Sequence, residues 1–200
     1  MSIRNEILEP DRFYHIFNRG INSQPIFLNN ENYLYFLRKV YDYLYPVLEI
    51  YSYCLMPNHF HLLIKIKSED VLTAFWNKKP KKNENSGLHM QDKIVSKQFA
   101  DLFNSYTQAF NKMHSRKGSL LDSPFKRKKI DTEQYLRTTI IYIHQNPEAI
   151  VTNFRDYKYS SYQAVVSNAK TNIKREEIIN LFEDKNNFKI SHNSSVDFDL

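Results

Sequence analysis

Two histidines one residue apart are the part of this sequence best suited to metal chemistry. The segment MPNHFHLLIKIK, residues 56–67, places His59 and His61 at the start of an apolar run. Side chains alternate along a strand, so both imidazoles would point to one face, about 7 Å apart, while Phe60 points to the other. Two imidazoles at this separation can share one divalent ion if a third ligand comes from elsewhere; otherwise they are two polar residues on a strand face. A nucleotide hydrolase with histidines at three alternating positions is excluded, because the third position is Leu63.

A phenol and a carboxamide share one face of the last main helix that the sequence predicts. In DTEQYLRTTIIYIHQNP, residues 131–147, apolar residues at helical spacing form a core-facing stripe. At about 100° per residue, Tyr142 lies more than about 90° from the centre of that stripe, and Asn146 lies about 40° from Tyr142. An Asn oxygen is an acceptable ligand for Mg²⁺ or Mn²⁺. If these two residues bind no metal, Tyr142 would be a partly buried amphipathic aromatic residue, and Asn146 would cap the helix before Pro147.

The elements that must position these residues follow from periodicity and capping. The sequence predicts strands at 12–19, 47–55, 59–67 and 120–130, and main helices at 29–45, 96–114 and 131–145. The order strand, helix, strand, strand, helix, strand, helix is that of a ferredoxin-like α+β fold, an antiparallel sheet with helices packed on it. Pro124 interrupts the fourth strand and therefore predicts an edge position for it.

The chain is predicted to have one core domain with two appendages. The core spans residues 1–165 and carries a flexible, polar insert near 77–92, which contains Pro and Gly. Residues 166–200 are expected to form a C-terminal helical extension, with an amphipathic helix near 175–182 and a frayed polar tail from Asp184 onward. The remaining histidines are expected to be structural or exposed; they are His15, His89, His114, His144 and His192.

Composition describes a folded, basic protein. The 200 residues are 42% hydrophobic and include 14 Tyr and 14 Phe, enough for a sizeable core. A net charge of +6 permits a polyanionic partner such as nucleic acid, although abundant Lys, Asn, Ile, Tyr and Phe are also what AT-rich coding produces. The single Cys54 excludes an internal disulfide and a cysteine metal cluster. Without an apolar signal region or a membrane-spanning run, the sequence predicts a soluble intracellular protein.

Two motifs together resemble a known family. MPNHFHLLI, followed about eighty residues later by YIHQNP, is similar to the single-tyrosine (Y1) HUH transposases of the IS200-like family, and most similar to the REP-associated tyrosine transposase branch. HUH denotes His, a hydrophobic residue and His. The segments YHIFNRG (14–20), SPFKRKKI (123–130) and SSY (160–162) also resemble family features. The resemblance covers about residues 10–165.

The resemblance implies an HUH-type endonuclease and assigns roles to the residues above. Tyr142 would be the nucleophile, and His59, His61 and Asn146 would bind Mg²⁺ or Mn²⁺. Some relatives carry Gln at the third ligand position; Gln145 lies about 100° further round the helix, so Asn146 fits better. The family cleaves single-stranded DNA, often beside an imperfect hairpin. Cleavage leaves a 5′-phosphotyrosine and a free 3′-OH that can rejoin another end.

The resemblance also gives meaning to the basic segments. Lys126, Arg127 and Lys128 precede the tyrosine helix, and Arg12 and Arg19 flank the first strand; all five are expected to bind DNA phosphates. The expected partner is single-stranded or hairpin DNA in the bacterial cytoplasm, at the nucleoid. No membrane association is expected, and a homodimer is possible.

Three other functions compete with a strand-transfer enzyme. A domesticated relative would hold hairpin DNA without cutting it, but a pure binder has no need for the complete set of two histidines, tyrosine and asparagine. Replication initiators and relaxases of the same chemistry often place the tyrosine before or far from the histidines and carry larger attachments, for which 200 residues leave no room. A three-carboxylate transposase is disfavoured, because the predicted core strands offer few acids.

Overall fold

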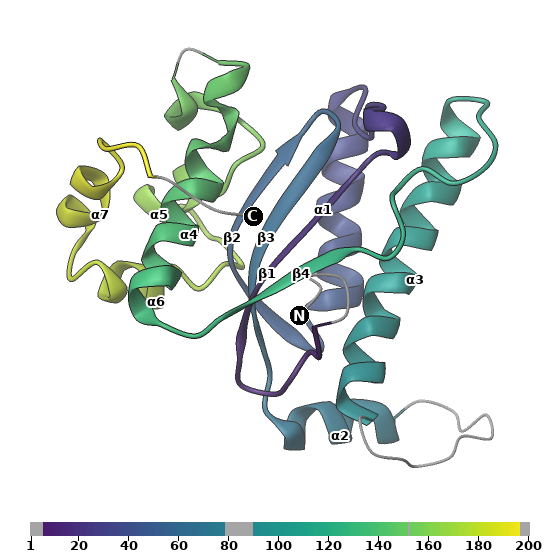
Figure 1. Ribbon diagram of the computed structural model, residues 1–200, viewed down its shortest axis with the longest axis horizontal. Helices are drawn as coiled ribbons and strands as arrows, with labels where there is room; N and C mark the ends of the chain where they lie inside the picture. Colours follow the sequence, from purple (N-terminus) through teal and green to yellow (C-terminus); the bar gives the residue numbers. More distant parts are fainter. Residues whose placement is uncertain (1–5, 79–89, 152, 197–200) are drawn as a thin grey trace.

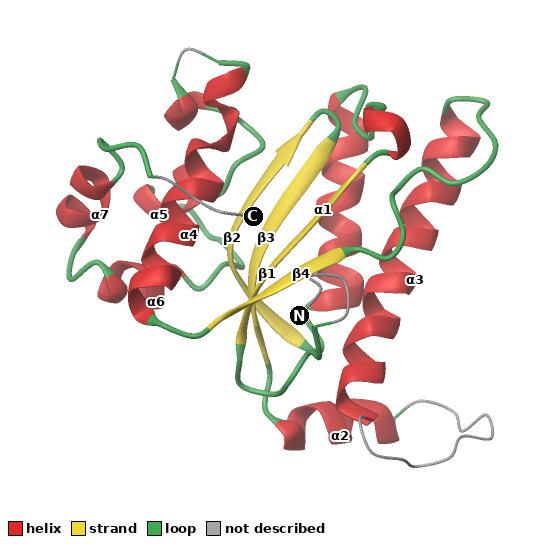
Figure 2. Cartoon of the chain, in the orientation of Figure 1, coloured by secondary structure: helices red, strands yellow, loops and turns green. Residues whose placement is uncertain are grey.

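Four strands form one antiparallel sheet at the centre of the molecule (Figure 2). The computed structural model describes residues 6–78, 90–151 and 153–196. In sheet order the strands are β2 (Leu48–Met56), β3 (His59–Ile66), β1 (Phe13–Arg19) and β4 (Lys126–Ile130). This order, with helices between β1 and β2 and between β3 and β4, is the ferredoxin-like arrangement. The predicted α+β fold class is therefore confirmed.

Helices cover both faces of the sheet (Figure 1). On one face, α1 (Asn30–Leu44) packs beside α3 (Met90–Met113), and the short α2 (Glu69–Asn77) contacts α3. On the opposite face, α4 (Glu133–Gln145) lies against β2 and β3. The sheet therefore separates α4 from the α1–α3 layer. Within the described residues, no helix is long and apolar enough to cross a membrane.

Alternation along β3 decides which side chains face which layer. The ring of Phe60 points to the α1–α3 layer, where its centroid lies 5.1 Å from that of Phe36 and 5.8 Å from that of Phe103. All three rings belong to the buried core or pack against it. The residues on either side of Phe60 must then point to the α4 face.

A turn at Pro57 and Asn58 sets where β3 begins. The backbone N–H of Gly20 donates to the carbonyl of Asn58 at 2.9 Å, and that of Ile26 donates to the carbonyl of Pro57 at 2.7 Å. Glycine is needed here because a Cβ on Gly20 would lie 2.1 Å from the carbonyl oxygen of Gln24. The loop after β1 thus holds the turn and the first histidine of β3 in place.

Local capping begins α1 and α4 close to where the sequence predicts them. The side chain of Asn29 accepts a hydrogen bond from the N–H of Asn32 at 3.0 Å, which begins α1. Thr132 accepts from the N–H of Tyr135 at 3.2 Å and begins α4.

Two predicted boundaries were wrong. The fourth strand covers only residues 126–130 rather than 120–130, because Pro124 has no N–H for the ladder and Leu121 forms only an isolated bridge with Gly20. The edge position of this strand is confirmed. Helix α3 begins at residue 90, six residues earlier than predicted. The insert expected near 77–92 falls largely on residues 79–89, which lie outside the described residues.

The frayed C-terminal tail was also a wrong prediction. After α5 (Tyr162–Val166) and α6 (Arg175–Leu181), helix α7 spans Lys185–Ser191, capped by the side chain of Asp184. Its Phe188 is fully buried. Local composition did not predict this burial, because the rings that Phe188 contacts, Tyr162 and Phe182, lie on other parts of the chain.

A buried histidine pair docks α7 on α4. His144 Nδ1 lies 3.0 Å from His192 Nε2, and His144 Nε2 lies 2.9 Å from the hydroxyl of Ser161. His192 Nδ1 in turn donates to the carbonyl of Phe188 at 2.7 Å. Both histidines therefore have a structural role: they connect α4 to the C-terminal end of α7.

Candidate active site

The two histidines of β3 lie together on the α4 face of the sheet. His61 pairs with Phe17 of β1 and with Cys54 of β2, and His59 pairs with Arg19 at the end of β1. The two imidazole centroids are 5.1 Å apart and the rings are perpendicular. Their common face was predicted from alternation alone.

Helix α4 brings Tyr142 and Asn146 to the same place. The ring of Tyr142 lies 5.4 Å from that of His61, edge to face at 87°. The Oδ1 atom of Asn146 lies 3.0 Å from the Nε2 atom of His59. Phenol, carboxamide and two imidazoles, from elements about eighty residues apart, therefore converge on one point between sheet and helix.

Gln145, the alternative to Asn146, points elsewhere. Its Nε2 donates to the carbonyls of Ser194 and His192, at 2.9 and 3.3 Å, in the segment that follows α7. The rotation of about 100° per residue turns adjacent side chains to different faces of the helix. The structure places Asn146, and not Gln145, beside the histidines.

Sequence reasoning missed a third histidine at the site. His15 of β1 is buried, and its Nε2 lies 2.8 Å from Nδ1 of His61. Its ring stacks on that of His61 with centroids 5.0 Å apart, and lies 6.0 Å from the ring of Tyr142. Alternation along β1 could have shown that His15 and Phe17 point to the same face of the sheet. That this face meets His61 depends on the register of β1 against β3, which the alternation does not give.

Burial controls the charge of these groups. Burial lowers the pKa of His59, and the hydrogen bond with Asn146 opposes this shift. Burial also lowers the pKa of His61, to well below its usual range. Burial, with the nearby Lys128 cation, lowers the pKa of His15 to about 3. Burial raises the pKa of Tyr142 above 10.0, and the side-chain hydrogen bond of Asn146 acts against that rise. The site at neutral pH therefore holds neutral imidazoles and a neutral phenol.

The donor set fits a divalent cation. His59 Nδ1 lies 2.7 Å from Asn58 Oδ1, while its Nε2 faces Asn146 Oδ1. A neutral imidazole has one N–H and cannot donate to both oxygens. With the proton on Nε2, His59 donates to Asn146. With the proton on Nδ1, it donates to Asn58, and the lone pairs of His59 Nε2 and Asn146 Oδ1 face each other, an arrangement that a cation would stabilise. Nδ1 of His61 lies 2.8 Å from Nε2 of His15, so Nε2 of His61 could bind the same cation if its proton is on Nδ1.

No carboxylate of the described residues lines the pocket beside this donor set. Among the described residues, no three His, Cys, Asp or Glu side chains group in a way that could hold a metal ion. A metal here would depend on the Asn146 carboxamide and on ligands from outside the chain. A phosphate is such a ligand, and its charge would compensate for the neutral protein donors.

A pocket of about 250 Å³ opens beside the histidines and is lined by His59, His61, Tyr142, Arg19 and Lys126, among others. The Lys126 ammonium lies 5.5 Å from the ring centroid of Phe17. Lys128 follows on the same strand face, with its ammonium 5.5 Å from the ring of Tyr135 on α4. Three predicted DNA-binding cations thus lie at the site or on the strand face that leads away from it.

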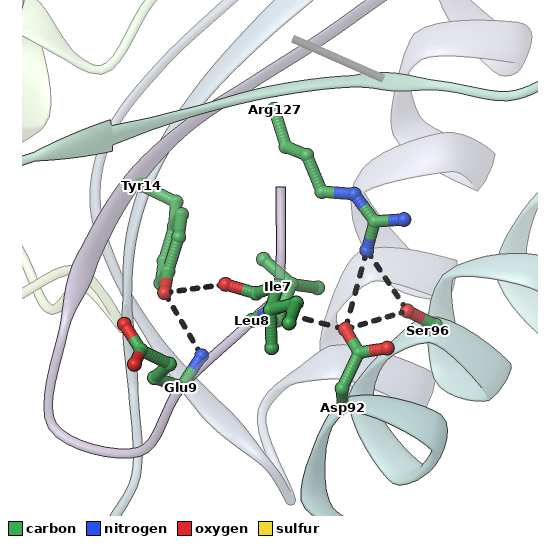
Figure 3. Close-up of polar contacts among 7 residues, drawn as sticks. All are labelled: Ile7, Leu8, Glu9, Tyr14, Asp92, Ser96 and Arg127. Atoms are coloured by element: carbon green, nitrogen blue, oxygen red, sulfur yellow. Dashed lines mark hydrogen bonds and ion pairs between the residues drawn. The ribbon is translucent and has the colours of Figure 1, made fainter. Parts of the chain in front are cut away.

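The other two predicted cations lie elsewhere. Arg127 points to the opposite face of the sheet, toward Asp92 and Ser96 on α3 (Figure 3), at 3.4 and 3.0 Å. The backbone N–H of Leu8 donates to the same Asp92 at 3.0 Å, so Asp92 joins both Arg127 of β4 and the segment before β1 to α3. Arg12 precedes β1 at its far end, roughly 23 Å from Arg19 along the strand. The structure does not bring Arg12 or Arg127 to the pocket.

The chain shares its fold with a tyrosine transposase. The solved structure is described as the REP-associated tyrosine transposase bound to a REP hairpin; it superposes with a TM-score of 0.52 over 84% of this chain and 87% of that chain, at 15% sequence identity. Neither a family model nor a curated protein matches the sequence. At that identity, the likeness establishes the fold, and the function must be argued from the site.

Proposed function

We propose that this protein cleaves and rejoins single-stranded DNA beside a hairpin through a 5′-phosphotyrosine on Tyr142. The observation that carries the proposal is the convergence of Tyr142 and Asn146 from α4 with His59 and His61 from β3 at one pocket. The shared fold with a protein bound to a DNA hairpin supports the substrate class.

Each side chain has a defined task in this reaction. The Tyr142 oxygen attacks the scissile phosphorus, a P–O(Tyr) bond forms, and the P–O3′ bond breaks. The phenolic proton leaves to water and the departing 3′-oxygen is protonated to a free 3′-OH. Attack of a 3′-OH on the phosphotyrosine reverses the step and joins a new end. No nucleoside triphosphate is needed, because the phosphotyrosine conserves the bond energy.

Tyr142 cannot act unaided. A phenol with a pKa near 10 is about a thousandth ionised at pH 7, and burial raises the pKa of Tyr142 further. We propose that His59, His61 and Asn146 hold Mg²⁺ or Mn²⁺, which would withdraw charge from the phosphate oxygens and orient the phosphate for in-line attack. Two imidazole donors favour Mn²⁺ over Mg²⁺. The Asn146 hydrogen bond to Tyr142 also holds the phenol beside the histidines.

The cations define a path for the strand. Arg19 and Lys126 line the pocket and would bind phosphates next to the scissile bond. Lys128 would bind a phosphate further along β4. Arg19 is ion-paired with Asp122 at 3.1 Å but its side chain is 58% exposed, so it can contact DNA without disrupting the core.

A covalent-trapping assay tests the proposal. The protein is incubated with Mn²⁺ and a labelled DNA hairpin that carries a single-stranded flank, taken from the sequence around its own gene. A labelled adduct that survives denaturant, and is absent with Tyr142→Phe or with chelator, is the expected result. Hairpin binding with no adduct under any metal would instead indicate a binding protein without strand transfer.

A further inference from the structure

His15 and His61 share a single proton between two buried rings. Nε2 of His15 and Nδ1 of His61 are 2.8 Å apart, so one nitrogen must donate and the other accept. The two rings are 0% and 3% exposed, and burial without a counter-charge favours neutral imidazoles, each with one N–H. Two arrangements of the protons are then possible, and they differ in whether Nε2 of His61 carries a lone pair or a proton.

In one arrangement His61 donates from Nδ1, and its Nε2 keeps a lone pair that can bind a metal. In the other arrangement His15 donates from Nε2, and His61 must carry its own proton on Nε2, where a metal would have to bind. Only the first arrangement permits coordination by His61. It requires His15 to accept through Nε2 and to carry its proton on Nδ1.

We infer that His15 is a positioning residue, which accepts the Nδ1 proton of His61 and so presents the Nε2 lone pair of His61 to the site. The inference rests on the proposed metal-dependent function. It assigns a role to a strand outside the two motifs that the sequence singles out.

The surroundings of the pair favour a fixed ring orientation. The rings of His15, Phe17 and His61 stack within 26° of parallel, with centroids 4.8 to 5.8 Å apart. The ring of Tyr142 stands across this stack, at 76° to His15 and 87° to His61. A rotation of the His61 ring would break the hydrogen bond to His15 and the stack together. His59 has the equivalent support, since its Nδ1 lies 2.7 Å from Asn58 Oδ1.

The experiment compares His15→Gln and His15→Met with the parent, all as full-length, metal-free protein. Gln places a carbonyl oxygen near the position of Nε2 and can still accept the proton, whereas Met has similar length and no strong acceptor. Long-range ¹⁵N–¹H NMR reports which nitrogen of His61 is protonated, with His61→Gln used to assign its signals. An EPR titration with Mn²⁺ then measures metal affinity, and circular dichroism checks the fold.

The parent should show His61 protonated on Nδ1. His15→Met should shift His61 toward the Nε2-protonated form and weaken Mn²⁺ binding by about 10- to 100-fold, as loss of a supporting hydrogen bond does at metal sites. His15→Gln should recover most of both. A parent His61 protonated on Nε2 overturns the inference, even if neither variant folds. So does His15→Met with parental tautomer and affinity. A parent with the expected tautomer that binds no Mn²⁺ would refute the metal proposal while leaving the hydrogen-bond assignment intact.

Discussion

The Nε2 atom of His59 lies 3.0 Å from the Oδ1 atom of Asn146, although 87 residues separate them in the sequence. Asn146 also hydrogen-bonds to Tyr142 through its side chain. One carboxamide at the end of α4 therefore connects an imidazole of the sheet to the phenol of the helix. This placement gives Asn146 two possible tasks, as a metal ligand and as a cap of α4, which different measurements separate.

Asn146→Ala should weaken Mn²⁺ binding by roughly tenfold or more, because it removes one of three protein donors. Asn146→Asp should bind Mn²⁺ at least as tightly as the parent, since a carboxylate adds charge to a neutral site. An EPR titration measures both. Gln145→Ala is the matched control and should leave the titration unchanged. If Asn146 only caps the helix, Asn146→Ala would cost about 0.5–1 kcal/mol of stability and its metal titration would superimpose on the parent's.

Tyr142→Phe should abolish the covalent DNA adduct while keeping the hairpin affinity within about twofold, because only the phenolic oxygen is removed. Denaturing gels with labelled DNA measure the adduct, and fluorescence anisotropy measures binding. Tyr135→Phe, about two turns closer to the start of α4 and in contact with Lys128, is the control and should form the adduct. An adduct that persists in Tyr142→Phe and disappears in Tyr135→Phe would transfer the nucleophile to Tyr135.

The salt dependence of DNA binding should distinguish the two faces of β4. The double variant Lys126→Gln, Lys128→Gln should reduce the slope of log K against log salt by about 1.4, at about 0.7 for each lost phosphate contact on single strands. Arg127→Gln should leave the slope unchanged, because its guanidinium is bound to Asp92 on α3. It should instead lower the free energy of unfolding by about 1 kcal/mol or more, since a partly buried carboxylate loses its partner. An equal change of slope in both variants would show that DNA binding is not confined to the face of β4 that carries Lys126 and Lys128.

Stability should fall on mild acidification because of the pair that docks α7. Burial lowers the pKa of His192 to about 4 in the folded protein. The unfolded chain, with an ordinary pKa of about 6.5, therefore binds more protons as the pH drops from 6.5 toward 4, and the folded state loses stability over that window. His192 alone accounts for a loss of about 2 kcal/mol between pH 7 and pH 5.

Chemical denaturation at the two pH values measures that loss. His192→Phe should be less stable than the parent at pH 7, because it breaks the hydrogen bond to His144, but it should show a smaller drop on going to pH 5. A drop as large as the parent's would mean that His192 is already protonated in the folded protein.

The sequence by itself determined the elements and the faces that its local periodicities define. Alternation placed His59 and His61 on one side of a strand, and a rotation of about 100° per residue placed Tyr142 and Asn146 on one side of a helix. Capping residues and prolines located the ends of α1 and α4. These inferences succeeded because a side chain's direction within one element depends only on its own backbone.

Only the tertiary structure decided which faces meet. The register of β1 against β3 brings His15 to His61, and no local pattern in either strand specifies that register. The packing of α4 directs Asn146 to His59 and turns Gln145 to the C-terminal segment. Arg127 pairs with Asp92 on α3 and so points away from the pocket. His144 contacts His192 and so helps to fold a C-terminal segment that was predicted from its composition to be frayed. Contacts between distant segments depend on pairing and packing across the whole fold, which local spacing does not encode.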